Sequence, residues 1–347
     1  MHLSKSSQLG YNELLKTDLN EVIEDNAVHF KDLSSKRVLL LGGTGFVGKW
    51  LLASLVHARI EMSLDFEIVV VTRDSERTRK LLNLNHKSGV FFLDHDLSKG
   101  ALVFPDKFDV LVHGATPSVP STGSFNETNV RETSINATRC IIDASKQGSR
   151  VLNLSSGAVF GSLRNSRGCV PELGKVGTPI NSYAEAKIEI EKSLDEFALR
   201  NEIHLTHARL FAFAGPYISL IDHFAVGNFI QNVITGTDIV VKGNSKTTRS
   251  YMYPTDLVSS LMRLITEKSL SHINIGSPVA LTMRELAQTC SKLGGKLPVI
   301  FKGENEAPSS YVPEAFLLSN SLGLANLVTL EESLSRWIMW LKAKDFS

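Results

Sequence analysis

Apolar residues occur along the chain in short blocks that are separated by helical patterns. This alternation is typical of a parallel β-sheet with helices between its strands. It predicts an α/β fold with a doubly wound parallel (Rossmann) sheet, in which ligands bind at the carboxyl ends of the strands. The blocks that we expect to form buried strands are residues 38–41, 68–71, 90–93, 110–112, 151–154 and 203–209.

The regular alternation weakens after about residue 215. Helices are predicted near 222–234, 256–266, 282–293 and 330–341, with a short strand at 239–241. We therefore expect a Rossmann domain over 37–215 and a smaller mixed α/β substrate-binding region over 216–347, some segments of which return to the large domain. Residues 1–36 form an N-terminal helical extension, in which apolar side chains at helical spacing favour packing on the domain surface: Leu14, Leu15, Leu19, Val22 and Ile23.

The segment after the first strand contains three glycines at the spacing Gly-x-x-Gly-x-x-Gly. Gly42 permits a tight turn, Gly45 allows backbone N–H groups to approach a pyrophosphate, and Gly48 lets the following helix pack close to the strand. The N-terminus of that helix, predicted over residues 49–58, favours an anion. A purely steric turn is the alternative, but the flanking strand and helix favour dinucleotide binding.

Charge and cysteine content exclude several classes of protein. The chain has 37 Lys and Arg against 36 Asp and Glu, so no overall field attracts nucleic acid or an anionic membrane. Three scattered cysteines match neither a disulfide framework nor a metal motif. Without an apolar run of about 18 residues or a signal-like start, we expect a cytoplasmic protein that binds no membrane.

A serine, a tyrosine and a lysine have the spacing of an acid-base site. Ser156 ends the predicted fifth strand, and Tyr183 and Lys187 share one face of the next helix. An ammonium and a positive nicotinamide ring lower the pKa of a phenol toward the working range, and the serine hydroxyl holds the substrate oxygen. The pair alone is common by chance, so its position after the serine strand carries the prediction.

From residue 37 onward the chain resembles the extended short-chain dehydrogenase/reductase family, in its NAD-dependent epimerase/dehydratase branch, which modifies nucleotide sugars. The resemblance rests on segments that occur in the family's order. Besides the glycine turn and Ser156, Tyr183 and Lys187, they are Asp96-Leu97, 109–116, Asn136, 155–161, Pro171-Glu172, 209–216, 249–253 with Asp256, and 274–276.

The resemblance implies further roles for single residues. Asp96 and Leu97 would contact adenine, and Arg249 would bind the nucleotide-sugar diphosphate through its planar guanidinium, with a surface ion pair as the alternative. Asn228 is a candidate amide ligand of the sugar or pyrophosphate, or simply a helix-surface residue. The remaining expected cofactor contacts are Thr44, Phe46, Val47, Arg73, Ala115 and Thr116.

The chain departs from the family pattern where the reaction type is set. The resemblance implies an acid after the catalytic serine or threonine in the 4,6-dehydratases and glucuronate decarboxylases, but here Gly157 and Ala158 follow Ser156. This favours hydride transfer alone, as in a nucleotide-sugar C4 epimerase, with an NADPH-dependent ketoreductase as the alternative. A non-catalytic dinucleotide-sensing protein is the rival from another class, and the complete Ser, Tyr and Lys set disfavours it.

The second strand ends in Thr72-Arg73-Asp74, where this fold reads the cofactor ribose. An acid there favours NAD and an arginine favours NADP. Arg73 leans toward NADP, although Asp74 could serve NAD.

Other expectations concern metals, loops and assembly. We interpret His113 as a strand-end side chain and assign no metal, because His204, His207 and His223 lack neighbouring carboxylates in the sequence. The loops 117–125 and 161–181 are expected to shape the pocket. The resemblance implies a homodimer through helices at 130–146 and 183–200, whose apolar residues would furnish core and interface: Ile135, Ile141, Ile142, Ile188, Ile190 and Leu194.

Overall fold

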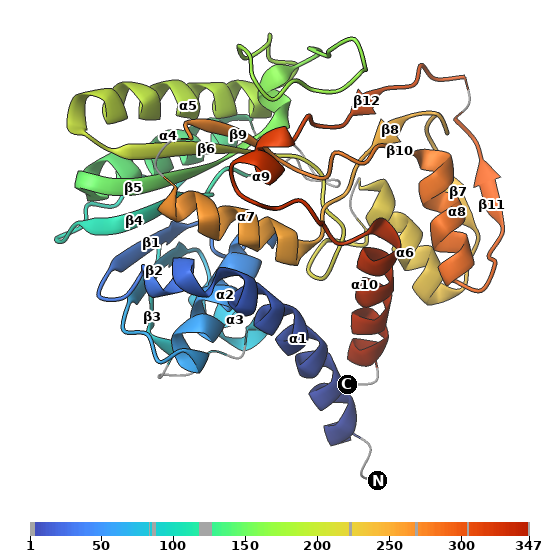
Figure 1. Cartoon of the computed structure of the whole chain (residues 1–347), viewed down its shortest axis with the longest axis horizontal. Helices are drawn as coiled ribbons and strands as arrows, with labels where there is room; N and C mark the ends of the chain where they lie inside the picture. The colour runs from blue at the N-terminus through green and yellow to red at the C-terminus, as the bar shows by residue number, and fades with distance from the viewer. Residues whose placement is uncertain are drawn as a thin grey trace.

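The computed structural model describes residues 4–82, 84, 88–117, 127–221, 224–267, 270–303 and 305–345, with the side chains of 4–14, 344 and 345 left out. Its centre is a seven-stranded sheet in which every neighbouring pair is parallel (Figure 1). This confirms the predicted doubly wound sheet. The strands, in spatial order, are β3 (Val90–Asp94), β2 (Glu67–Thr72), β1 (Arg37–Leu41), β4 (Phe108–His113), β5 (Ser145–Ser156), β6 (His204–Leu210) and β9 (His272–Ile275).

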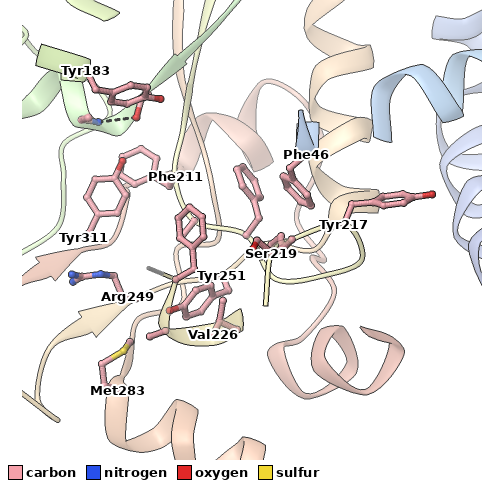
Figure 2. A pocket seen from close by; sticks show the side chains of 17 residues that line it. Phe46, Tyr183, Phe211, Tyr217, Ser219, Val226, Arg249, Tyr251, Met283 and Tyr311 are labelled. Carbon is pink, nitrogen blue, oxygen red and sulfur yellow. Dashed lines mark hydrogen bonds between the residues drawn. The ribbon is translucent and has the colours of Figure 1, made fainter. Parts of the chain in front are cut away.

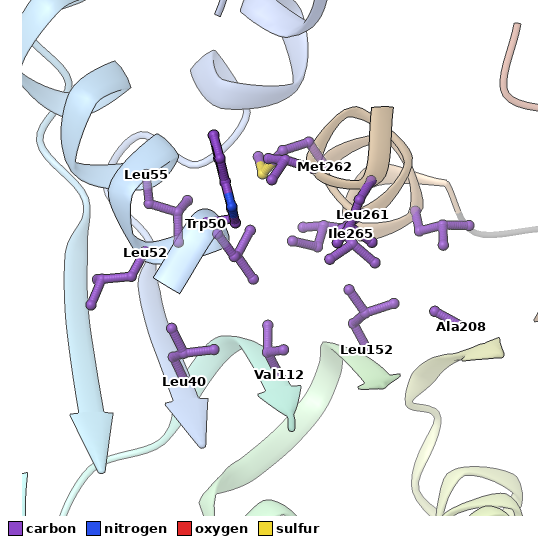
Figure 3. Close-up of a cluster of buried hydrophobic side chains, with 14 of the residues drawn as sticks. Leu40, Trp50, Leu52, Leu55, Val112, Leu152, Ala208, Leu261, Met262 and Ile265 are labelled. Atoms are coloured by element: carbon purple, nitrogen blue, oxygen red, sulfur yellow. The ribbon is translucent and has the colours of Figure 1, made fainter. Parts of the chain in front are cut away.

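Successive residues of the central strands point to opposite faces of the sheet, and both faces are covered. Leu40, Val112 and Leu152 share a buried cluster with Trp50 of α2 (Phe46–Glu61) and Leu261 of α7 (Pro254–Thr266) (Figure 3). The intervening residues, such as Leu39, Leu111 and Val151, pack on the other face against α4 (Glu127–Ala144) and α5 (Ser182–Asn201). Burial on both faces explains the near-continuous apolar strands.

The predicted N-terminal helix is α1 (Ser4–Lys31), which packs against α2, α7 and α10 (Leu330–Asp345). Val22 is fully buried, so the helix belongs to the core of the domain as well as to its surface. Asp18 accepts a hydrogen bond from the Tyr253 hydroxyl at 2.6 Å and forms an ion pair with Arg336 at 2.9 Å. The ion pair joins the N-terminal and C-terminal helices.

The smaller C-terminal region has its own apolar cluster, which includes Phe229, Leu286 and Trp337. Other C-terminal segments return to the large sheet: β9 pairs with β6, and α7 and α9 (Phe316–Asn320) pack nearby. No helix in the described part is long and apolar enough to span a membrane. The remaining elements are α3 (Ser75–Leu81), a 3-10 turn at Gly157–Phe160, α6 (Ala225–Thr235), α8 (Met283–Leu293), the parallel pair β7 (Ile239–Val241) and β11 (Val299–Phe301), and the sheet of β10 (Leu281–Thr282), β8 (Thr248–Arg249) and β12 (Ser310–Tyr311).

Candidate active site

A pocket of about 690 Å³ lies between the carboxyl ends of β5 and β6 and the smaller region. Figure 2 shows the Tyr183 side chain at one end and Met283 at the other. Among the described residues that line it there is no Asp, Glu, His or Lys, so hydroxyl groups and one guanidinium supply its chemistry. The polar and aromatic lining includes Phe46, Ser156, Tyr183, Phe211, Tyr217, Ser219, Arg249, Tyr251 and Tyr311.

The structure brings Ser156 and Tyr183 together, as the sequence predicts. Ser156 is the last residue of β5, and α5 begins at Ser182 behind an N-cap in which Asn181 accepts the Ala184 N–H at 2.8 Å. This cap fixes the first turn of the helix, which carries Tyr183. The Ser156 hydroxyl acts to lower the pKa of Tyr183, and Ser156 Oγ accepts the Ala158 N–H at 3.1 Å.

Lys187 lies one turn further along α5 and is almost fully buried. Its Nζ donates a hydrogen bond to the Leu154 carbonyl at 2.6 Å and lies 5.7 Å from the centroid of the Tyr183 ring. Burial lowers the pKa of Lys187 to about 7 and raises the pKa of Tyr183. The phenol therefore depends on a nearby positive charge to ionise.

The glycine turn forms a cradle of the predicted kind. Gly42 has φ +85° and a Cβ there would collide with the Gly114 carbonyl, while a Cβ at Gly48 would collide with the Gly42 carbonyl. At Gly45 the nearest atom to a built Cβ is 3.7 Å away, so this glycine leaves an open space beside the first turn of α2. That helix has no side-chain cap at Gly45, which suits its first-turn N–H groups to an anion.

The other predicted cofactor residues lie along the neighbouring strand ends. The Thr116 hydroxyl is buried without a partner, and the Leu97 carbonyl accepts the Asn136 amide at 2.8 Å, which ties that loop to α4. Arg73 is exposed after β2, whereas Asp74 caps α3 by accepting the Arg77 N–H at 2.9 Å. An open cradle and an orphaned hydroxyl fit a dinucleotide.

The two predicted substrate ligands have different positions. Arg249 lines the pocket on β8, and its guanidinium donates to the Thr248 carbonyl at 2.8 Å and the Ser309 hydroxyl at 3.1 Å. Among the described residues no carboxylate forms an ion pair with Arg249, which disfavours the alternative of a surface ion pair. Asn228 is half-buried on α6 and is not among the lining residues, which there are Phe224, Ala225 and Val226.

The interpretation of His207 as lacking a neighbouring carboxylate is wrong. Its Nε2 lies 3.1 Å from Asp195 on α5, and its ring stands 5.0 Å from that of His272, its register partner on β9. Asp195 precedes His207 by 12 residues in the chain, and only the packing of α5 on the sheet brings the two side chains together. His207 Nδ1 also meets the Asn153 amide at 2.9 Å. The group lies outside the pocket, and His223 is outside the described residues.

Sequence reasoning missed the aromatic half of the pocket. Phe211, Tyr251 and Tyr311 come from three segments that are far apart in the chain. The only sequence signal was their proximity to recognised motifs, since Phe211 follows the strand that contains Arg209 and Tyr251 follows Arg249. Tyr311 has no such neighbour, because β12 reaches the site only by pairing with β8.

Comparison with known proteins places this geometry in a family. The model of the NAD dependent epimerase/dehydratase family matches residues 38–276. The chain belongs to this family. It is therefore an NAD-dependent enzyme of the epimerase/dehydratase type, as the resemblance predicts.

Individual relatives differ in the reaction that their names state. UDP-glucuronic acid decarboxylase 5 of Arabidopsis thaliana is 28% identical over 310 residues, which cover 87% of this chain and 88% of the relative. A UDP-N-acetylglucosamine 4-epimerase from Methanobrevibacter ruminantium, solved with UDP-N-acetylmuramic acid, has a TM-score of 0.73 at 19% identity over 90% of this chain and 99% of its own. A UDP-glucuronic acid 4-epimerase from Bacillus cereus, solved with its nucleotide sugar and NAD, has a TM-score of 0.71 at 18% identity over 88% and 99%. These structures share the fold of this chain.

Proposed function

We propose that this protein moves hydride between a nicotinamide cofactor and C4 of a nucleotide sugar, as a nucleotide-sugar 4-epimerase. One observation carries the proposal: Ser156 and Tyr183 line a pocket, with Lys187 behind them, whose described lining holds no carboxylate or imidazole. Hydride transfer at a carbinol carbon needs one proton acceptor and one group that holds the oxygen. Hydroxyl groups on this wall supply both.

Each residue has one task in this chemistry. Ser156 holds the sugar hydroxyl by a hydrogen bond, and Tyr183 takes its proton while hydride leaves the carbon. Lys187 stabilises the phenolate by its charge, and its bond to Leu154 fixes its position. NAD bound in the glycine cradle supplies the acceptor and later the donor of the hydride. An epimerase returns the hydride to the opposite face of the 4-keto sugar, and Tyr183 returns the proton.

The smaller region supplies the contacts for a nucleoside diphosphate. Arg249 reaches the pocket without a carboxylate partner, which suits bidentate binding of a phosphate. Several family relatives carry UDP-sugars in their names, so UDP-sugars are the first candidates. The role of Asn228 as an amide ligand stays a prediction that needs a rearrangement of α6.

The pocket disfavours the decarboxylase reaction named in the sequence relatives. The sequence carries Gly157 and Ala158 after Ser156, and Gly157 is buried with no titratable group. We therefore propose that the sugar keeps all of its carbon atoms in the reaction. Release of CO2 from UDP-glucuronic acid would overturn this part.

Arg73 supports a second candidate, an NADPH-dependent 4-keto-sugar reductase. Asp74 is engaged as a helix cap, so Arg73 is the side chain left to meet a 2'-phosphate. The two functions differ in the cofactor: an epimerase keeps its own, and a reductase exchanges it every turnover.

The test is to incubate the purified protein with NAD and with UDP-glucose, UDP-N-acetylglucosamine or UDP-glucuronic acid, and to follow the sugars by NMR. A C4 epimer with no net change in cofactor absorbance supports the epimerase. Stoichiometric consumption of NADPH with a 4-keto sugar supports the reductase, and Arg73→Asp should then reverse the preference for NADPH over NADH. No reaction with any of these pairs would contradict both candidates.

A homodimer through α4 and α5 is also proposed, but with other residues of these helices in the interface. Ile141, Ile190 and Leu194 are buried within the protomer against the sheet, so they are core residues. Leu199 on α5 is 89% exposed and is the better interface candidate. Light scattering should give twice the mass of 38.1 kDa, and Leu199→Lys should favour the monomer. A cytoplasmic location stays a prediction.

A further inference from the structure

A carboxylate and two imidazoles meet at the edge of the large sheet, outside the pocket. His207 in β6 and His272 in β9 are register partners, and β9 is the outermost strand of the sheet (Figure 1). Asp195 comes from α5, which packs on β6. One ligand atom from each of the three side chains lies within 4.8 Å of the other two. None of the three residues lines the pocket, so the proposed hydride transfer does not use them.

The distances in this group suit a small metal ion. Nitrogen and oxygen ligands of a tetrahedral Zn²⁺, with bonds of about 2.0–2.1 Å, are about 3.3 Å apart. His207 Nε2 and Asp195 Oδ1 are 3.1 Å apart. The Asp195 side chain is 51% exposed and His272 is half-buried, so both can turn toward a common centre and water can complete the coordination.

A buried amide behind His207 is compatible with metal binding by its ring. The Asn153 amide nitrogen lies 2.9 Å from His207 Nδ1, and Asn153 Oδ1 is buried without a partner. With the amide turned by 180°, this oxygen accepts the Nδ1–H of the other tautomer, and the lone pair of Nε2 then faces Asp195. A histidine that binds a metal through one ring nitrogen commonly donates its other N–H to such an acceptor.

The local charge also suits a cation. Arg209 follows His207 on the same face of β6, but its guanidinium is paired with the Glu191 carboxylate at 2.7 Å, so this pair adds no net charge. Asp195 contributes a negative charge to the group, and two neutral imidazoles contribute none. Imidazole and carboxylate are ligands that Zn²⁺ takes in proteins.

We propose that Asp195, His207 and His272 form a binding site for Zn²⁺ or a similar divalent transition metal, which is held by these three ligands and water. The ion links α5 to β6 and to the edge strand β9, so its role is structural. It stabilises the folded state, because the unfolded chain does not hold the three ligands together. The sequence predicted no metal, since only folding brings the carboxylate to the histidines.

The test uses the full chain, purified without a histidine tag and freed of metal with a chelator that is then removed. Calorimetry measures the binding of Zn²⁺ to the parent and to Asp195→Ala, His272→Gln and His204→Gln. The last is the matched control, because His204 is a half-buried histidine of the same strand that does not belong to the group. Co²⁺ is used in a second series, since its visible absorbance reports the number and geometry of its ligands.

We expect one Zn²⁺ per chain in the parent and in His204→Gln, and loss of this binding in Asp195→Ala and His272→Gln. Asn153→Ala, which removes the amide behind His207, should weaken Zn²⁺ about tenfold. Zn²⁺ at about 100 times its Kd should raise the melting temperature by about 5 °C in the parent and the control. Melting without metal checks that the two variants at the exposed ligands remain folded.

Two results would overturn the site. One is equal Zn²⁺ binding by the parent, Asp195→Ala and His272→Gln, because the ion would then be bound elsewhere. The other is no binding by the parent at millimolar Zn²⁺. Neither measurement requires a nucleotide sugar, so the outcome is independent of the proposed function.

Discussion

Helix α5 carries four ionisable side chains at a spacing of four residues, and its two halves differ in how those groups are partnered. In the first half, Tyr183 lines the pocket together with Ser156, and Lys187 behind it donates only to a backbone carbonyl. Glu191 and Asp195 in the second half are paired with Arg209 and His207. The charged groups of the second half are therefore paired with one another and do not line the pocket.

This contrast indicates that catalysis depends on side chains whose hydrogen-bonding capacity is not used up within the protein. The Glu191 carboxylate accepts from Arg209 at 2.7 Å and from the Ser155 hydroxyl at 2.6 Å. Burial raises its pKa, but the hydrogen bonds and charge of Arg209 outweigh this and hold the pKa of Glu191 below its ordinary value. A group so satisfied has no capacity left for a substrate, whereas Ser156 and Tyr183 retain theirs.

The largest effect on activity should come from removing the Tyr183 phenol in the first half of α5. Tyr183→Phe should lower hydride transfer by at least about 100-fold, because the described lining of the pocket offers no carboxylate or imidazole to take the proton instead. Stopped-flow absorbance of the nicotinamide would measure it. Asp195→Asn, three turns further along the same face, is the control and should keep the rate; equal rates in both variants would remove the distinction between the halves.

In the second half of α5, breaking an ion pair should lower the free energy of unfolding. Glu191→Ala leaves the Arg209 guanidinium buried without its counter-charge, which should cost about 3–5 kcal/mol in the free energy of unfolding. Asp195→Asn, at a half-exposed position, should cost less than about 1 kcal/mol. Urea unfolding of both variants tests this, and similar losses would show that burial is not the deciding difference.

Asp256 provides a comparison with Glu191, because it is a buried carboxyl that forms no ion pair with any described residue. Burial raises its pKa to about 7, against the hydrogen bond from the Val328 N–H at 2.9 Å. Because the folded state binds this proton more tightly, its contribution to stability is present below about pH 4 and is lost as the pH rises to about 7.

Asp256→Asn removes this titration while an amide oxygen can still accept the Val328 N–H. The variant should be more stable than the parent at pH 8 by a few kcal/mol, at about 1.4 kcal/mol per pKa unit, and no more stable at pH 4. Urea midpoints across this range provide the check. A pH-independent difference would show that the carboxyl is not protonated in the folded protein.

The smallest effect concerns binding. Arg249→Ala should weaken a nucleotide sugar about 10- to 100-fold, through loss of charge-assisted hydrogen bonds, and leave NAD binding unchanged. Calorimetry with UDP-glucose in the presence of NAD would measure it. Arg164→Ala is a useful neighbour for comparison, because its guanidinium is committed to the Ser310 and Gly161 carbonyls. Equal affinities for the parent and Arg249→Ala would remove Arg249 from the site.

Much of the sheet could be predicted because its strands are apolar on both faces and follow each other in the chain. The catalytic trio was predictable for a similar reason, since Ser156 ends a strand and Tyr183 and Lys187 open the next helix. Tyr311 could not be predicted, because a two-residue strand has no pattern of its own and is placed by pairing with β8. His207 and His272 were equally hidden, since only the register of β6 and β9 makes them neighbours.

The position of α1 shows the same limit. Its helical spacing was visible in the sequence, but the depth to which Val22 is buried depends on α7 and α10, which come more than 200 residues later.

The central claim is hydride exchange at C4 with the sugar skeleton intact, and isotopic labelling tests it most directly. UDP-glucuronic acid with deuterium at C4 and carbon-13 at C6 is incubated with the protein and NAD, and UDP-glucose with deuterium at C4 is treated in parallel. We predict a C4 epimer of one of them that retains deuterium at C4 and, in the uronic acid, carbon-13 at C6. Loss of labelled CO2, or exchange of the C4 label with solvent, would contradict the claim.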